Sequence, residues 1–148
     1  MFNALFRRLL RQSTPLSAHP EKAEHLLRGR LGEDAARHYL EAQGLKFLTA
    51  NFATRRGEID LIFRDAEGLA FVEVKTRSSE EWSRPAAAVT RKKKRRISLA
   101  ALDYLRELRG VRVPFRFDIV EVLVEDRDVR RIRHLRNAFP LACPNYYR

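Results

Sequence analysis

Acidic residues stand inside two short apolar runs near the middle of the chain. Residues 57–76 read Gly-Glu-Ile-Asp-Leu-Ile-Phe-Arg-Asp-Ala-Glu-Gly-Leu-Ala-Phe-Val-Glu-Val-Lys-Thr, and residues 65–68 form a polar turn between the runs. This pattern predicts a β-hairpin, and counting outward from the turn places Asp60 directly opposite Glu73. Opposed side chains in an antiparallel pair are about 4.5–5.5 Å apart at Cβ, and like charges there destabilise the pair. A divalent cation between the two carboxylates would remove that repulsion.

The same register places Glu58 opposite Lys75. Because side chains alternate along a strand, Glu73 and Lys75 share one face, and Asp60 lies on the matching face of the partner strand. An ion pair on a solvated sheet face is the ordinary explanation of an isolated Glu-x-Lys sequence. It does not account for two acids opposed across the hairpin, nor for an inward-facing acid, Glu33, in the helix that precedes the hairpin.

Three carboxylates from these elements would make an oxygen-rich, incompletely filled coordination sphere. Such a sphere suits Mg²⁺ or Mn²⁺, with water completing it. Phosphodiester hydrolysis fits this chemistry, because the metal lowers the pKa of a bound water and neutralises charge on the scissile phosphate. Lys75 could then orient the water or stabilise the developing negative charge. Asp118, in a later apolar run, is expected to make a structural hydrogen bond instead.

The elements that must position these residues follow from periodicity and turn signals. Residues 21–43 have a helical pattern with Leu26, Ala36 and Leu40 on one stripe, and Glu33 lies on the same stripe. We therefore expect Glu33 to face the sheet. The order αβββαββ implies an α/β domain with a mixed sheet flanked by helices. We expect strands over residues 46–51, 58–64, 69–76, 115–124 and 130–136, a loop over residues 78–88, and a helix from the N-cap Thr90 to Arg109.

The chain is 148 residues long, which is enough for one domain with a real core. We assign residues 1–20 to an N-terminal extension, residues 21–136 to the domain and residues 137–148 to a C-terminal tail. Cys143 is the only cysteine, which excludes an intramolecular disulfide and favours a reducing compartment, hence the cytoplasm. No apolar run reaches the length of a transmembrane helix. The extension has arginines but no acid, so a targeting or membrane-surface helix is the alternative to a loosely attached segment.

The charge of the chain is unevenly distributed along its length. The formal net charge is +11 and the pI is near 10.6, which favours an anionic partner such as nucleic acid or an acidic membrane surface. Residues 31–83 carry a net charge of −3, whereas residues 84–112 carry +8. Acids therefore gather around the hairpin and bases gather just after it.

Six consecutive basic residues, 91–96, open the second expected helix, where the helix dipole is already positive. A bound phosphate would relieve this charge; a solvated charge run or a localisation-like tract is the alternative. Lys93 lies four residues before Ile97, on the inward face, and could reach the acidic cluster. Arg55 and Arg56 could clamp phosphates or serve solubility alone. The candidate nucleic-acid-binding residues are therefore Arg55, Arg56, Arg91, Lys92, Lys94, Arg95 and Arg96.

The run Gly57-Glu58-Ile59-Asp60 followed by Glu73-Val74-Lys75 resembles the PD-(D/E)XK restriction-endonuclease-like superfamily, and in particular its YraN-like branch of predicted endonucleases, which are similar to Holliday junction resolvases. The resemblance implies a restriction-endonuclease-like fold, with Asp60 and Glu73 as metal ligands, Lys75 as the catalytic lysine and Glu33 as the helix acid that completes the site. For Glu58 it implies a position behind the metal ligands or an ion pair with Lys75. Further resemblance to the branch lies in Leu31-Gly32-Glu33-Asp34-Ala35-Ala36, Asn51, Val89-Thr90, Lys93 and Arg116-Phe117-Asp118.

Two functional interpretations follow. The first is a Mg²⁺- or Mn²⁺-dependent endonuclease that acts on nucleic acid; DNA with branched or irregular structure is the favoured substrate, and RNA is the alternative. The second is a non-catalytic nucleic-acid-binding module on the same fold. A complete set of two acids and a lysine favours the first, because a pure binder gains nothing from acids that repel phosphates. An interaction protein that docks through its N-terminus is a third alternative, and a homodimer is compatible with the sequence.

Overall fold

The computed structural model of the protein describes residues 20–82, 89–109 and 111–143. The expected N-terminal extension lies outside the described residues except for Pro20, as do residues 144–148 of the expected tail. Within the described part of the chain, no helix is both long and apolar enough to cross a membrane. The elements are α2 (Pro20–Ala42), β1 (Lys46–Ala53), β2 (Glu58–Asp65), β3 (Gly68–Arg77), α3 (Ser79–Trp82), α4 (Arg91–Glu107), β4 (Phe115–Glu125) and β5 (Asp128–Phe139).

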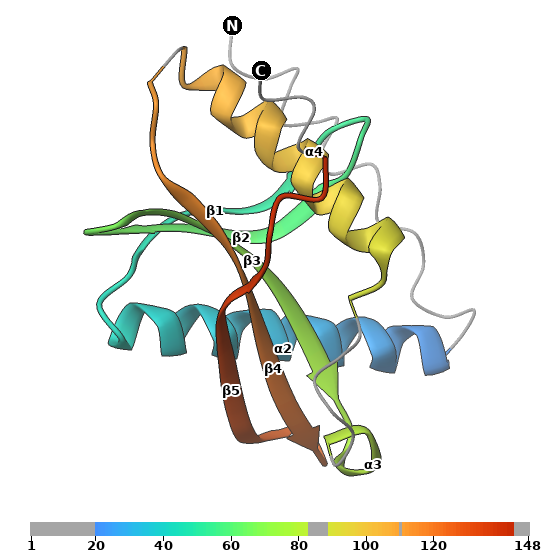
Figure 1. Cartoon of the computed structure of the whole chain (residues 1–148). Coiled ribbons are helices and arrows are strands. Elements are labelled where there is room, and N and C mark those ends of the chain that lie inside the picture. The colour runs from blue at the N-terminus through green and yellow to red at the C-terminus, as the bar shows by residue number, and fades with distance from the viewer. Residues whose placement is uncertain (1–19, 83–88, 110, 144–148) are drawn as a thin grey trace, which may run out of the picture.

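The five strands form one sheet in the order β1-β2-β3-β4-β5 (Figure 1). The strands β3 and β4 are parallel, whereas the other neighbouring pairs are antiparallel. A parallel pair needs a crossover connection, and α4 lies within the segment that joins β3 to β4. This mixed sheet, flanked by helices, confirms the predicted α/β architecture and is consistent with a restriction-endonuclease-like fold.

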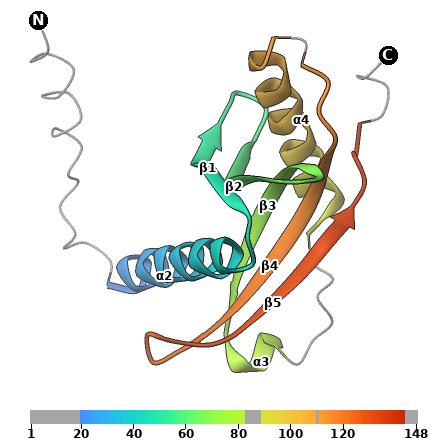
Figure 2. The same cartoon turned by 90° about the vertical axis from the view of Figure 1, so that its left-hand side faces the viewer.

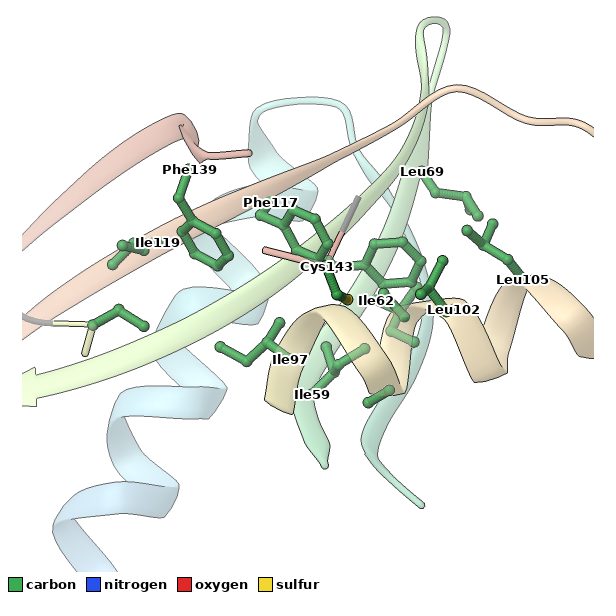
Figure 3. Packing of buried hydrophobic residues seen from close by; sticks show 14 residues of the cluster. Ile59, Ile62, Leu69, Ile97, Leu102, Leu105, Phe117, Ile119, Phe139 and Cys143 are labelled. Carbon is green, nitrogen blue, oxygen red and sulfur yellow. The ribbon is translucent and has the colours of Figure 1, made fainter. Parts of the chain in front are cut away.

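Helices cover both faces of the sheet and divide the interior into two cores. The two views agree that α2 crosses one face and α4 lies against the other (Figure 2). The α4-side core contains Ile97 and Leu105 of the helix together with Phe71 and Phe117 of the sheet, and Figure 3 shows part of it. The α2-side core contains Leu40 and its neighbours. A side chain that is buried but belongs to neither apolar core therefore needs a separate explanation.

Helix α2 buries its side chains against the sheet over its second half, whereas its first half makes a surface ion pair between Glu24 and Arg127 of the β4–β5 turn. Ala36 and Leu40 are fully buried, as predicted, whereas Leu26 is 61% exposed. The prediction of a continuous inward stripe is therefore wrong for the first turns, which extend past the sheet (Figure 2). Contact is close at Gly32, because a Cβ atom there would lie 2.0 Å from the Oγ1 atom of Thr76.

Helix α3 and strand β5 differ most from the sequence prediction. The expected loop over residues 78–88 begins with the short helix α3, in which the backbone N–H of Trp82 donates to the carbonyl of Ser78 at 3.0 Å. Strand β5 is longer at both ends than the expected 130–136. Its last residue, Phe139, is 4% exposed and stacks on Phe117 with ring centroids 5.0 Å apart, so burial of an aromatic ring extends the strand.

Candidate active site

Strands β2 and β3 separate close to the predicted acidic pair. Their ladder has the predicted register and ends at the pair Leu61 and Val72. Beyond this pair, the backbone N–H of Val74 in β3 has no backbone partner in β2. It donates instead to the side-chain Oδ2 atom of Asp60 at 2.7 Å. This bond holds Asp60 at the point where β2 and β3 separate, next to Glu73.

The predicted opposition of Glu58 and Lys75 is wrong. Strand β2 ends its pairing with β3 before reaching Glu58, whose ladder partner is Ala53 of β1. Lys75 instead lies opposite Glu121 of β4, because β3 follows β4 over its whole length and so diverges from β2. Glu58 is exposed and, in the described part of the chain, forms no ion pair with Lys75.

Strand β2 and its neighbour β1 are irregular at the level of Asp60, so that side chains two residues apart point to opposite faces of the sheet. Ile59 packs in the α4-side core and Leu61 in the α2-side core, although residues two apart in a regular strand share a face. The ladder pairs on either side place Asn51 of β1 opposite Asp60, and Asn51 has a φ of 52°. Asparagine tolerates this left-handed conformation better than most residues. The irregularity keeps the half-buried Asp60 out of both apolar cores.

Glu73 is the central acid of the site. It is 4% exposed, and its Oε1 atom lies 3.7 Å from the Nζ atom of Lys75 and 3.5 Å from that of Lys93. Its Oε2 atom is buried and has no hydrogen-bond partner among the described residues. Leaving a buried carboxylate oxygen unpaired is costly, so this atom is available to a ligand that the protein itself does not supply.

Electrostatics at Glu73 differ from those of an ordinary surface acid. Burial first, and then the negative charge of Asp60, raises the pKa of Glu73 to about 7, although Lys93 and Lys75 oppose the shift. The two acids are therefore close enough to disfavour ionisation of both, as the hairpin register predicts. A divalent cation between them would reverse this preference.

Glu33 lies beside the pair but does not complete a three-acid cluster. It is half-buried, and its pKa is raised by burial first and then by the charges of Asp60 and Glu58. The close packing at Gly32 explains why α2 brings Glu33 to this place. Among the described residues, however, no three His, Cys, Asp or Glu side chains are grouped so that they could hold a metal ion. Direct ligation of a metal by Glu33 stays a prediction, and the geometry shows Asp60 and Glu73 with Glu33 as their neighbour.

The basic run at the start of α4 divides into inward and outward side chains. Thr90 is the N-cap, as predicted, and its side-chain oxygen accepts a hydrogen bond from the N–H of Lys93 at 3.2 Å. The side chain of Lys93 points to Glu73, also as predicted. Lys94, a member of the candidate nucleic-acid-binding set, is half-buried over the ring of Phe139, with Nζ 5.5 Å from the centroid, although a solvated charge run would leave it exposed. The exposed members are Arg91, Lys92, Arg95 and Arg96.

The two arginines before β2 have different surroundings. Arg55 is exposed. The Nε atom of Arg56 donates to Asp103 of α4 at 3.1 Å, its Nη2 atom also contacts that carboxylate, and Nη2 donates to the carbonyl of Leu99 at 3.4 Å. Arg56 therefore anchors the bend to α4, and we remove it from the expected phosphate-binding set. The same bend packs tightly, since a Cβ atom at Gly57 would lie 2.0 Å from the carbonyl oxygen of Arg96.

Asp118 has the structural role expected from the sequence. It is fully buried and accepts hydrogen bonds from Arg116 at 3.1 Å, His134 at 2.9 Å and the N–H of Asn137 at 2.8 Å. Burial alone would raise the pKa of Asp118, but the bonds from His134 and Asn137 and the charge of Arg116 hold it below the ordinary value. These contacts join β4 to β5 and leave Asp118 outside the acidic pair.

Sequence reasoning missed one charged cluster beside the site. Glu121 is fully buried, and the Nε atoms of Arg77 and Arg133 each lie 2.7 Å from one of its oxygens. Part of the signal was present, because Arg77 continues the alternation of Glu73 and Lys75 on one face of β3. Its partners Glu121 on β4 and Arg133 on β5 are distant in sequence, so no sequence pattern indicated the cluster.

Comparison with known proteins gives one consistent result. A family model described as "Uncharacterised protein family UPF0102" matches residues 32–122, which include both acids and both lysines of the site. A UPF0102 protein from Trichlorobacter lovleyi is 44% identical over 115 residues, covering 77% of this chain and 91% of its own. Another from Pelotomaculum thermopropionicum is 43% identical over 115 residues, covering 76% and 95%. A third from Geotalea uraniireducens is 40% identical over 122 residues, covering 82% and 96%.

Proposed function

The chain belongs to the UPF0102 family, and we propose that it is a metal-dependent endonuclease that hydrolyses phosphodiester bonds of nucleic acid. One observation carries the proposal. The buried Glu73 has an oxygen without a partner, next to a second acid that is fixed where two strands separate. A pair of this kind, placed among lysines, is expected of a site that binds a cation and a phosphate.

The donor set fits Mg²⁺ or Mn²⁺. Both acids offer carboxylate oxygens, which these hard cations prefer, and Mg²⁺ is commonly held by one or two carboxylates with water at its other positions. The Oε2 atom of Glu73 is available, whereas the Oδ2 atom of Asp60 already accepts from Val74 and leaves Oδ1 for a ligand. A bound cation would supply Lewis-acid activation of water and of the scissile phosphate.

The lysines would act on the phosphate rather than on the cation. Lys75 and Lys93 both lie near the Oε1 atom of Glu73, on the α4 side of the sheet. An ammonium group donates hydrogen bonds and cannot ligate a metal. We assign Lys75 the stabilisation of charge that develops on the phosphate, in keeping with the resemblance to the PD-(D/E)XK superfamily, and we assign Lys93 the orientation of Glu73.

The charge around the site supports a nucleic-acid substrate, and the resemblance to nucleases similar to Holliday junction resolvases favours DNA, including branched DNA. The exposed Arg91, Lys92, Arg95 and Arg96 surround the start of α4, where the helix dipole also favours an anion. These contacts would be to phosphates and carry no sequence preference. A cytoplasmic location agrees with the buried, unpaired Cys143.

Binding of Mn²⁺ tests the proposal independently of any substrate. Titration followed by electron paramagnetic resonance should show one site in the wild-type protein and a loss of at least about tenfold in affinity for Asp60→Asn and Glu73→Gln. Glu58→Gln is the matched control, because Glu58 is an exposed acid on the same strand as Asp60. Equal affinity in all four proteins would overturn the assignment of the metal site.

A further inference from the structure

The cluster at the end of β3 joins three strands through one carboxylate. Glu121 of β4 is wholly buried, and its oxygens lie 2.7 Å from Arg77 of β3 and 2.7 Å from Arg133 of β5. Among the described side chains, no other acid lies within ion-pair distance of either arginine. Two guanidinium groups, which are always charged, therefore face one carboxylate, and the cluster has a surplus positive charge.

The hydrogen-bonding capacity of these arginines is also in excess. The Nη2 atom of Arg133 is buried without a hydrogen-bond partner among the described residues, and the Nε atom of Arg77 and the Oε1 atom of Glu121, which lie 2.7 Å apart, form an ion pair without hydrogen-bond alignment. A positive charge that must share its counter-ion with another, and a buried donor without an acceptor, are both unfavourable. A bound anion would remedy both defects, and the guanidinium group is suited to bidentate contact with phosphate.

The cluster continues the row of residues that forms the candidate active site. Glu73, Lys75 and Arg77 lie two residues apart on one face of β3, at intervals of about 6.6 Å, which is comparable with the separation of successive phosphates along a nucleic-acid strand. Lys75 is the ladder partner of Glu121, so the cluster directly adjoins the proposed catalytic lysine. The guanidinium carbon of Arg133 lies 4.3 Å from the ring centroid of Trp82 of α3. This contact holds the arginine at the surface end of the row, where its side chain is 38% exposed.

We propose that Arg77 and Arg133, oriented by Glu121, bind the phosphate adjacent to the one that is cleaved. This inference rests on the proposed nuclease function and adds the path of the substrate. The strand runs along β3 from the start of α4, across Glu73 and Lys75, to the arginine pair. Glu121 is a positioning residue in this arrangement, and Arg133 is the more accessible of the two phosphate ligands.

Equilibrium binding in the absence of metal tests the arginine pair without requiring catalysis. A fluorescein-labelled branched DNA is titrated with protein in EDTA over a series of KCl concentrations, and anisotropy gives Kd and its salt dependence. Arg133→Gln should weaken binding about fivefold to tenfold and reduce the slope of log K against log salt by about 0.9. Arg136→Gln is the matched control, because it removes the same charge from β5 at the far end, where Arg136 pairs with Glu67. It should change Kd less than about twofold.

The outcomes separate this inference from the proposed function. Thermal unfolding checks that each variant is folded, and Arg133→Lys keeps the charge beside Glu121 if Arg133→Gln does not fold; it should weaken binding by an intermediate factor. Wild-type binding that neither Arg133 variant changes, or that Arg136→Gln changes equally, would overturn the phosphate site and leave the nuclease untouched. A selective effect of Arg133 in a protein that never cleaves DNA would overturn the nuclease and retain the binding site.

Discussion

The Asp60 carboxylate takes the place of a backbone partner for Val74, whose N–H donates to Oδ2 at 2.7 Å. One oxygen of this acid therefore links the strands where they begin to separate, and we propose that the other binds the cation. The same side chain raises the pKa of Glu73. Structure and electrostatics at the site thus depend on one residue, and substitutions can separate the two contributions.

Asp60→Asn and Asp60→Ala should have different effects on stability. Asparagine still offers an oxygen to the N–H of Val74, so Asp60→Asn should keep most of the free energy of unfolding. Alanine leaves that group unpaired, and Asp60→Ala should cost about 1–3 kcal/mol. Urea unfolding measures both. Equal loss of stability in the two variants would show that charge, and not the hydrogen bond to Val74, is the stabilising contribution of Asp60.

Stability of the metal-free protein should fall as pH rises toward neutrality. Burial and Asp60 raise the pKa of Glu73 from 4.5 to about 7, so between these values the folded state binds a proton that the unfolded state releases. The stabilising contribution is complete below about pH 4.5 and is lost as pH rises through about 7. Relative to Glu73→Gln, the wild type should lose on the order of 2–3 kcal/mol across this range. Parallel stability curves for the two proteins in EDTA would contradict the raised pKa.

The two lysines of the site should have separable effects on cleavage. Lys75→Ala should reduce kcat by about 100-fold or more and retain Mn²⁺ binding, because the ammonium group serves the developing charge and not the cation. Lys93→Ala should have a smaller effect on kcat and should raise the pKa of Glu73, since Lys93 lowers it in the wild type. Lys46→Ala, which removes an exposed lysine at the start of β1, is the control. Loss of Mn²⁺ binding in Lys75→Ala would contradict the assigned role.

Two glycines of α2 provide a matched test of how the helix places Glu33. A Cβ atom at Gly32 would lie 2.0 Å from Thr76 Oγ1, whereas one at Gly29 would meet nothing within 4 Å. Gly32→Ala should destabilise the protein by about 1–3 kcal/mol, because helix and strand must move apart. Gly29→Ala should stabilise it by about 0.5–1 kcal/mol through helix propensity. Thermal unfolding distinguishes these signs, and a stabilised Gly32→Ala protein would show that the crossing is not close.

Local patterns made the hairpin predictable. Turn residues and alternation fix its register, and the ladder that ends at Leu61 and Val72 confirms it. The helical face of Lys93 was predictable for the same reason, because period and cap both lie within α4. The predicted pairing of Glu58 with Lys75 is wrong because β3 continues along β4 after its pairing with β2 has ended. Local sequence patterns do not show where one strand leaves another.

Partners far away in the sequence were invisible to the same reasoning. Arg56 reads as a solvent-exposed turn arginine until α4 brings Asp103 to it. Leu26 fits the inward stripe of α2, but the sheet ends before it, so the side chain is exposed. The placement of Glu33 near Asp60 was predictable from periodicity, whereas the close approach of the helix at Gly32 involves Thr76, which is distant in sequence.

Cleavage of labelled DNA is the measurement that tests the central claim most directly. Wild-type protein, Glu73→Gln and Glu58→Gln are incubated with branched, linear and single-stranded DNA in Mg²⁺, Mn²⁺ or EDTA, and products are resolved on a denaturing gel. We predict metal-dependent cleavage by the wild type and Glu58→Gln and none by Glu73→Gln, with similar DNA affinity in all three. Normal binding by the wild type without cleavage of any substrate in either metal would contradict the nuclease and favour a nucleic-acid-binding module.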